Sequence, residues 1–213
     1  MSIAVKICGV RTPDAVDAAA RAGATHLGFM FFAQSPRLVE PEHAHELALR
    51  APTLQAVAVT VDADNATLDT IVARAQPRLL QLHGLETVAR LREVKARYRL
   101  PVMKAIAIAE VSDVEGAHAF DGIADSLLFD TKSATTERGG TGSAFDWRLI
   151  AKEQWRSPWL LSGGLTPDNV AEAIRTTRAQ GVDVSSGVEK SRGEKDVALI
   201  ERFVKNARAA MIP

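Results

Sequence analysis

Short β-rich runs alternate with amphipathic helical stretches along this sequence, and this alternation constrains the fold more than any other feature. The predicted strands alternate β-branched residues with others, and the predicted helices repeat apolar residues every three to four positions. The predicted strands are 3–9, 26–32, 55–61, 79–83, 102–108, 126–130, 158–162 and 182–185. The predicted helices are 13–22, 41–50, 64–75, 85–98, 111–120, 145–152, 167–178 and 195–210. Eight such pairs indicate an α/β protein, a single (β/α)8 TIM barrel with parallel strands, as one domain over residues 1–213.

The structural alternative is an open, doubly wound sheet with a few extra strands. The first strand-to-helix turn lacks the pattern Gly-x-Gly-x-x-Gly, which counts against this alternative. With 213 residues the barrel is compact and has little spare loop.

Charge and cysteine content limit the classes of partner. Lys plus Arg and Asp plus Glu each number 26, so no global field attracts nucleic acid or a membrane, and local groups must hold any anion. One cysteine makes no internal disulfide, and the sequence shows neither a signal peptide nor a membrane span. These features predict a cytoplasmic protein, as a monomer or homodimer, without nucleic-acid or membrane partners.

Cys8 ends the first strand and is followed by Gly9. A lone cysteine in an apolar strand is most often a small buried hydrophobe. At the carboxyl end of a barrel strand, however, it faces the active site and can act as a base. A thiol base must ionise, which requires nearby positive charge to lower its pKa. Lys6 lies on the same face of the strand and can serve here, or it can simply pair with Asp183 on the last strand.

Asp130 ends the sixth strand. A carboxylate that ends a strand is a cap for the next turn about as often as it is a functional group. As a general acid it must be protonated before it acts, which partial burial favours. Cys8 and Asp130 come from the first and sixth strands, so they can approach one ligand from opposite sides.

Glycine clusters follow the last three strands, and they predict a phosphate site. One cluster by itself makes a turn, but barrels bind phosphate with the backbone N–H groups that follow strands seven and eight. The clusters are Gly139-Gly140-Thr141-Gly142, Ser162-Gly163-Gly164 and Ser185-Ser186-Gly187.

Three further polar segments can be interpreted as ordinary surface or structural residues or as functional ones. Ser35-Pro36-Arg37 presents a guanidinium at the tip of a fixed loop, where it is solvated or binds a carboxylate. His83, at the end of the fourth strand, is a structural histidine, a hydrogen-bonding group or a ligand. No second set of side chains with metal spacing accompanies it, so we predict no metal. The charged stretch 189–195 is expected to be a solvated loop before the last helix.

Seven motifs, in order from the first strand to the loop after the eighth, resemble those of the phosphoribosylanthranilate isomerase family of tryptophan biosynthesis. They are Lys6-Ile7-Cys8-Gly9, Ser35-Pro36-Arg37, Gln81-Leu82-His83-Gly84, Phe129-Asp130-Thr131, Gly139-Gly140-Thr141-Gly142, Ser162-Gly163-Gly164-Leu165 and Asp183-Val184-Ser185-Ser186-Gly187-Val188-Glu189. The resemblance implies a cofactor-free Amadori rearrangement of a small phosphorylated substrate, with Asp130 as general acid and Cys8 as base. It further implies that Arg37 holds the anthranilate carboxylate, and that His83 and Asp183 support the site. The phosphate would be held by the loops at Gly142, Gly163, Gly164, Ser186 and Gly187.

Two functional alternatives stay open. The first is a related histidine-pathway isomerase, which resembles this sequence in its fold but has an aspartate in place of Cys8 and needs a second phosphate site. No glycine-rich anion loop appears in the first half of the sequence. The second is a barrel that binds a phosphosugar without converting it. Only the presence of the candidate acid and base counts against this alternative.

Overall fold

The computed structural model describes residues 3–131 and 146–210. Within these residues, eight strands close into a barrel in chain order, each parallel to its neighbours. They are β1 (Ala4–Cys8), β2 (His26–Met30), β3 (Gln55–Thr60), β4 (Leu79–Leu82), β5 (Val102–Ile108), β6 (Ser126–Thr131), β7 (Trp159–Leu161) and β8 (Gly181–Val184). Pairing of β1 with β8, from Ala4 opposite Gly181 to Ile7 opposite Val184, closes the ring. The predicted TIM barrel is confirmed, and this closure rules out the open sheet.

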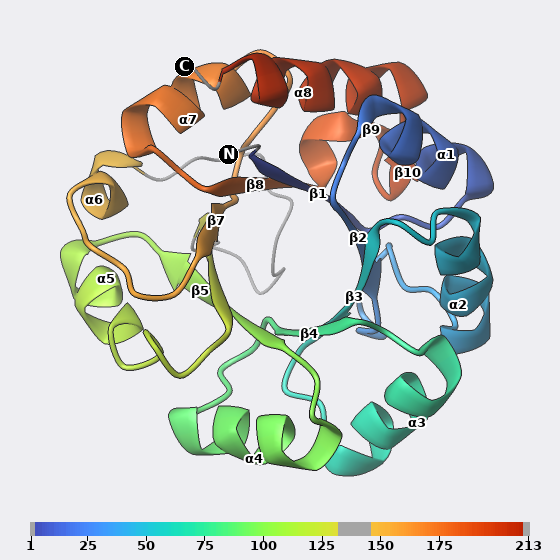
Figure 1. Ribbon diagram of the computed structural model, residues 1–213, viewed down its shortest axis with the longest axis horizontal. Coiled ribbons are helices and arrows are strands. Elements are labelled where there is room, and N and C mark those ends of the chain that lie inside the picture. Colours follow the sequence, from blue (N-terminus) through green and yellow to red (C-terminus); the bar gives the residue numbers. More distant parts are fainter. Residues whose placement is uncertain (1–2, 132–145, 211–213) are drawn as a thin grey trace.

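The helices form a ring outside the strands (Figure 1). They are α1 (Pro13–Ala22), α2 (Pro41–Arg50), α3 (Asn65–Ala75), α4 (Val88–Tyr98), α5 (Val111–Ala117), α6 (Arg148–Ala151), α7 (Val170–Thr177) and α8 (Val197–Ala209). Among the described residues, no helix has the length and apolar character needed to cross a membrane.

Alternation along the strands separates two apolar layers. Val5 and Ile7 pack outward, in the large layer between strands and helices. Cys8 belongs to a smaller cluster inside the barrel, formed by residues from alternate positions of β1, β3, β4, β5, β6 and β7. The first strand therefore turns Cys8 inward, away from the helices.

Most differences from the predicted elements lie at their ends. The bounds of β5 are as predicted, whereas α4 begins at Val88 rather than at residue 85. Thr87 caps α4 by accepting a hydrogen bond from the Arg90 backbone N–H at 3.2 Å. The Glu86 carboxylate accepts hydrogen bonds from the backbone N–H of Gly84, so residues 84–86 form a turn before the helix.

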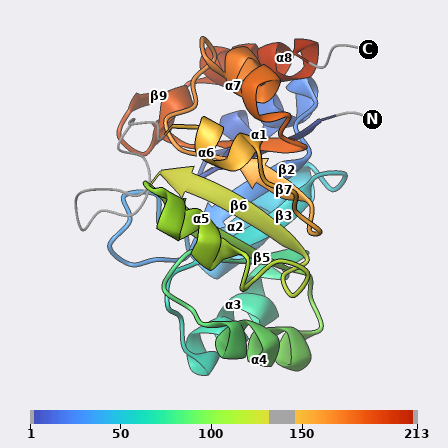
Figure 2. The ribbon, with the colours of Figure 1, turned by 90° about the vertical axis from the view of Figure 1, so that its left-hand side faces the viewer.

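The segment after β8 differs most from its prediction as a solvated loop. A short 3-10 helix, η1 (Ser186–Val188), leads into a hairpin of β9 (Glu189–Ser191) and β10 (Glu194–Lys195). The side chains of Glu189 and Lys195 are 4% and 2% exposed, so the solvated-loop prediction is wrong for both ends of this segment. Figure 2 shows β9 at the end of the barrel towards which the arrow of β6 points.

Candidate active site

The structure brings Cys8, from β1, and Asp130, from β6, to one cavity at the carboxyl ends of the strands. This cavity has a volume of about 50 Å³. It is lined by Cys8, Met30, Arg37, His83, Asp130, Asp183 and the loop residues 162–165 and 184–187. Of the residues predicted for the site, Gly142 lies outside the described residues, and all the others line this cavity.

Cys8 is 6% exposed and lies beside Gly28 of the neighbouring strand β2. A Cβ atom at position 28 would lie 3.0 Å from the Cys8 sulfur and 3.1 Å from Lys6 Nζ, so the absence of a side chain there makes room for both groups. Burial raises the pKa of the Cys8 thiol, and the positive charges of Lys6 and Lys195 oppose this only in part. Desolvation therefore outweighs the nearby cations at this sulfur.

Lys6 does both of the things that the sequence left open. Its Nζ donates a hydrogen bond to Asp183 Oδ1 at 2.8 Å, and its charge also acts on Cys8. Burial works to lower the pKa of Lys6, but Asp183 and Cys8 outweigh it and the pKa is raised. Asp183 Oδ2 in turn accepts a hydrogen bond from Ser162 Oγ at 3.1 Å. Lys6 is thus a buried cation held beside the thiol by a carboxylate on the neighbouring strand β8.

Asp130 forms a chain of contacts with β4. His83 Nε2 lies 3.3 Å from Asp130 Oδ2, and His83 Nδ1 lies 2.7 Å from the side-chain amide nitrogen of Gln81. The other carboxylate oxygen of Asp130 accepts a hydrogen bond from the Thr131 backbone N–H at 2.8 Å. His83 and Thr131 thus fix the orientation of the Asp130 carboxyl group at the cavity wall.

Arg37 is buried, which corrects the expectation of a guanidinium at a loop tip. The residue is 6% exposed, and Glu189 holds it through two parallel bonds, Nε to Oε1 at 2.7 Å and Nη2 to Oε2 at 2.9 Å. The alkyl stem of Arg37 crosses Gly9, where a Cβ would lie 2.5 Å from Arg37 Cδ. Gly9 also has a φ of 75°, which favours glycine, so the turn after Cys8 requires this residue for two reasons.

The glycine loops after β7 and β8 pack against each other. Gly163 and Gly164 have φ values of 86° and 65°, a conformation that L side chains rarely adopt. A Cβ on Gly187 would overlap the backbone carbonyl of Leu165, so the two loops approach each other at main-chain distance. Gly163, Gly164 and Gly187 all line this part of the cavity. Its role in phosphate binding stays a prediction.

Sequence reasoning missed two buried charged residues, Glu189 and Lys195, which form ion pairs with Arg37 of the cavity wall and with each other. Lys195 Nζ donates hydrogen bonds to Glu189 Oε1 at 2.8 Å and to the Ser185 backbone carbonyl at 2.9 Å. Burial works to raise the pKa of Glu189, but Arg37 and Lys195 outweigh it and lower the pKa to about 2. The only signal in the sequence was that Glu189 closes the motif that begins at Asp183.

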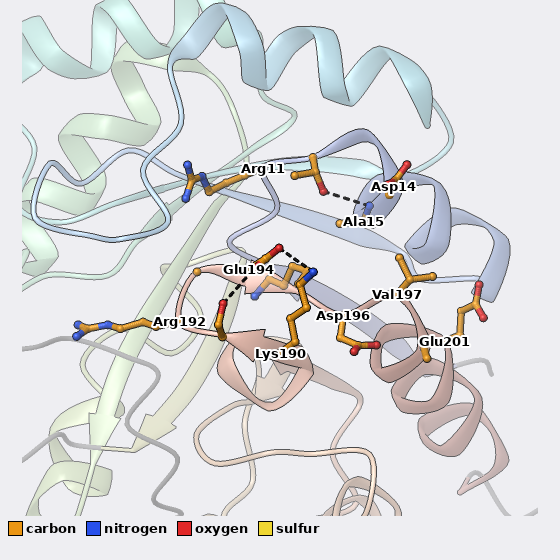
Figure 3. Close-up of a pocket in the computed structure, with 14 residues that line it drawn as sticks. Arg11, Asp14, Ala15, Lys190, Arg192, Glu194, Asp196, Val197 and Glu201 are labelled. Carbon is orange, nitrogen blue, oxygen red and sulfur yellow. Dashed lines mark hydrogen bonds and ion pairs between the residues drawn. The ribbon is translucent and has the colours of Figure 1, made fainter.

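A larger cavity, of about 830 Å³, lies between the start of α1, the hairpin and the start of α8, and its lining includes Lys195 (Figure 3). Its lining is mostly charged, and several of these charges are paired on the surface, as in the bond of 2.7 Å between Lys190 and Glu194. It holds neither Cys8 nor Asp130. Size therefore does not identify the reactive site in this molecule.

A metal site requires several His, Cys, Asp or Glu side chains that converge on one point. Across 3–131 and 146–210, no group of three or more His, Cys, Asp or Glu side chains is placed to hold a metal ion. The prediction of an enzyme without metal or cofactor stays a prediction.

Comparison with known proteins identifies the family. The family model described as N-(5'phosphoribosyl)anthranilate (PRA) isomerase matches residues 5–206. The chain belongs to the phosphoribosylanthranilate isomerase family. A relative named N-(5'-phosphoribosyl)anthranilate isomerase, from Bradyrhizobium sp. (strain ORS 278), is 49% identical over 213 residues, which cover 99% of this chain and 97% of the relative.

Solved structures of phosphoribosylanthranilate isomerases share the fold. The enzyme from Thermotoga maritima superposes with a TM-score of 0.89 at 36% identity, covering 97% of this chain and 99% of that one. A second isomerase structure, in complex with reduced 1-(o-carboxyphenylamino)-1-deoxyribulose 5-phosphate, gives a TM-score of 0.86 at 33% identity, with the same coverage. The ligand of that isomerase carries both a carboxylate and a phosphate.

Proposed function

We propose that this chain catalyses the Amadori rearrangement of N-(5′-phosphoribosyl)anthranilate, with Asp130 as the general acid and Cys8 as the general base. The observation that carries the assignment of roles is that both side chains line one cavity although they come from β1 and β6. Neither strand is the other's neighbour in the barrel, so the two groups reach a bound sugar from different directions. Family membership supports the reaction, and this geometry supports the pair.

The reaction needs one proton given and one proton taken. The Asp130 carboxyl group donates its proton to the ribose ring oxygen, the C1′–O bond breaks, and the nitrogen lone pair forms the C=N bond of an iminium ion. The Cys8 thiolate then removes the C2′ proton, the C–H electrons form the C1′=C2′ bond of an enolamine, and the C=N π electrons return to nitrogen. In the tautomerisation the C2′ hydroxyl loses its proton and C1′ gains one, which yields the C2′ ketone. A positioned acid or base contributes about 10²- to 10⁴-fold to such a step.

The charges around Cys8 make ionisation less costly than burial alone. Desolvation opposes the thiolate, whereas the cations Lys6 and Lys195 stabilise it. Lys6 is fully buried and held by Asp183, so its charge is fixed near the sulfur rather than screened by solvent. Lys6 therefore acts on Cys8 through its charge, and Asp183, which also lines the cavity, holds Lys6 in place.

The two ends of the substrate supply orientation. In this proposal the guanidinium of Arg37 binds the anthranilate carboxylate, and the loops that contain Gly163, Gly164, Ser186 and Gly187 bind the phosphate. Anchoring both ends holds the ribose between acid and base, which lowers the entropic cost of reaching the transition state. The oligomeric state, monomer or homodimer, stays a prediction. The cytoplasmic location stays a prediction as well.

The activity is tested by mixing purified protein with freshly made substrate in the presence of a metal chelator, and by following the fluorescence of the anthranilate adduct. We expect the fluorescence to fall in proportion to enzyme concentration, with or without chelator. Substrate binding without any loss of fluorescence would instead favour the alternative of a phosphosugar-binding barrel without turnover. Loss of activity with chelator, restored by added metal, would contradict the metal-free mechanism.

Arg37→Ala tests the carboxylate contact. In this mechanism Arg37 binds the substrate and transfers no proton. The variant should therefore chiefly raise KM, by about tenfold or more, with a smaller effect on kcat. Steady-state kinetics with the same fluorescence assay gives both constants. An unchanged KM would contradict the proposed role.

A further inference from the structure

The hairpin of β9 and β10 contributes two residues to a buried charged cluster around Arg37, and of this cluster only the charge of Lys195 acts in the proton-transfer mechanism. Arg37, Glu189 and Lys195 have side chains that are 8%, 4% and 2% exposed. Burial of charge is costly unless each group is paired, and these three are joined by ion pairs of 2.7 and 2.8 Å. Glu189 is the partner that Arg37 and Lys195 share in this cluster.

Glu189 fixes the Arg37 guanidinium in two ways. Its two oxygens accept from Nε and Nη2, which defines the plane of the guanidinium as well as its position. Glu189 is itself fixed, because Oε1 also accepts from Lys195 Nζ at 2.8 Å and Oε2 accepts from the Gly193 backbone N–H at 3.0 Å. The carboxylate therefore lacks the freedom to follow Arg37 if the arginine moves.

The opposite side of Arg37 is restrained by packing. Its stem lies over Gly9, directly after Cys8, and residue Gly193 of the hairpin turn packs closely on the Pro36 carbonyl. The hairpin thus contacts the arginine loop at its backbone and at its charged end. Together these contacts restrain both the stem and the guanidinium of Arg37.

We propose that Glu189 is a positioning residue that holds Arg37 by its Nε–Nη2 edge, so that a substrate carboxylate is received along the other edge in one fixed orientation. This inference rests on the proposed carboxylate contact of Arg37. It makes Glu189 a determinant of specificity, because the orientation of Arg37 matters only for substrates that carry the carboxylate. An arginine with a fixed orientation binds a second carboxylate without first losing side-chain freedom.

The test compares two substrates in four proteins: the parent chain, Glu189→Gln, Arg37→Ala and Glu194→Gln. The substrates are the phosphoribosyl adducts of anthranilate and of aniline, and the second of these lacks the carboxylate. Glu194→Gln is the matched control, because Glu194 lies on the same hairpin but its side chain is 56% exposed and pairs with the exposed Lys190. Product formation is followed by chromatography, so that both substrates are measured in the same way.

For Glu189→Gln we expect KM for the anthranilate adduct to rise about tenfold, with kcat changed less than about threefold. KM for the aniline adduct should stay at the parent value, and Glu194→Gln should match the parent on both substrates. The double variant Arg37→Ala/Glu189→Gln should be no worse than Arg37→Ala alone, since Glu189 acts through Arg37.

An equal rise in KM for both substrates would show that Glu189 is merely structural and would overturn the inference. Selective loss in Arg37→Ala but not in Glu189→Gln would also overturn it, while leaving the proposed function intact. No selective effect in Arg37→Ala would remove the carboxylate contact and this inference together. If Glu189→Gln does not fold, Glu189→Asp keeps the charge but withdraws it by one methylene, and the same selective rise in KM is expected.

Discussion

Lys6 and Cys8 share the inward face of β1, at positions where most barrels hold bulky apolar side chains. Each of the two groups is costly to bury in its charged form, and each partly offsets that cost for the other. Asp183 completes the arrangement by pairing with Lys6 at 2.8 Å. The Lys6–Asp183 ion pair thus belongs to the electrostatic environment of Cys8.

His26, at the start of β2, gives a prediction for stability against pH. Burial, with a smaller effect of Lys6, lowers the pKa of His26 to about 4 from its usual 6.5. The unfolded chain therefore takes up a proton at a higher pH than the folded one, so stability is lost as the pH falls from 6.5 towards 4. The loss amounts to about 3 kcal/mol at most.

His26→Gln removes this titration. Urea unfolding of both proteins between about pH 6.5 and 5, above the range in which most carboxylates titrate, should show a steeper fall for the parent chain. Parallel profiles for the parent and His26→Gln would contradict the assignment of this pH dependence to His26.

The strand β2 shapes the site although it supplies no reacting group. Gly28 pairs with Cys8 in the barrel, and a Cβ there would lie 3.0 Å from the sulfur. A contact this short forces the sulfur or Lys6 Nζ to shift by a few tenths of an ångström. The small residue on one strand thus determines the position of the base on the next.

Gly28→Ala should lower kcat about tenfold or more and destabilise the fold by about 1–3 kcal/mol through overpacking. Gly116→Ala is the control, because a Cβ at this position in α5 meets nothing within 4 Å and should stabilise the helix by about 0.5–1 kcal/mol. Activity assays and thermal unfolding measure both effects. Full activity in Gly28→Ala would show that the position of the sulfur is not under this constraint.

At the scale of the whole molecule, the features that the sequence predicts are those that depend on local patterns of residues. Alternation and turn residues give the order of the strands, and the inward direction of Cys8 follows from the pleat. The burial of Arg37 does not follow, because its partner Glu189 is 152 residues away and the pairing depends on the closure of the barrel. The start of α4 was also missed, since the turn before it is fixed by Glu86, which reaches back to the backbone of Asp62 at 2.9 Å.

The closed barrel joins an acid and a base that are distant in the chain, and Cys8→Ser tests this most directly. An alcohol ionises far less readily than a thiol, so kcat for Cys8→Ser should fall by about 10²- to 10⁴-fold in the fluorescence assay. Asp130→Asn, which has no proton to give, should fall by a similar factor. Binding of reduced 1-(o-carboxyphenylamino)-1-deoxyribulose 5-phosphate, measured by calorimetry, should change less than about threefold in both variants. A Cys8→Ser protein that folds, binds this ligand and converts substrate at the parent rate would contradict the proposed acid–base pair.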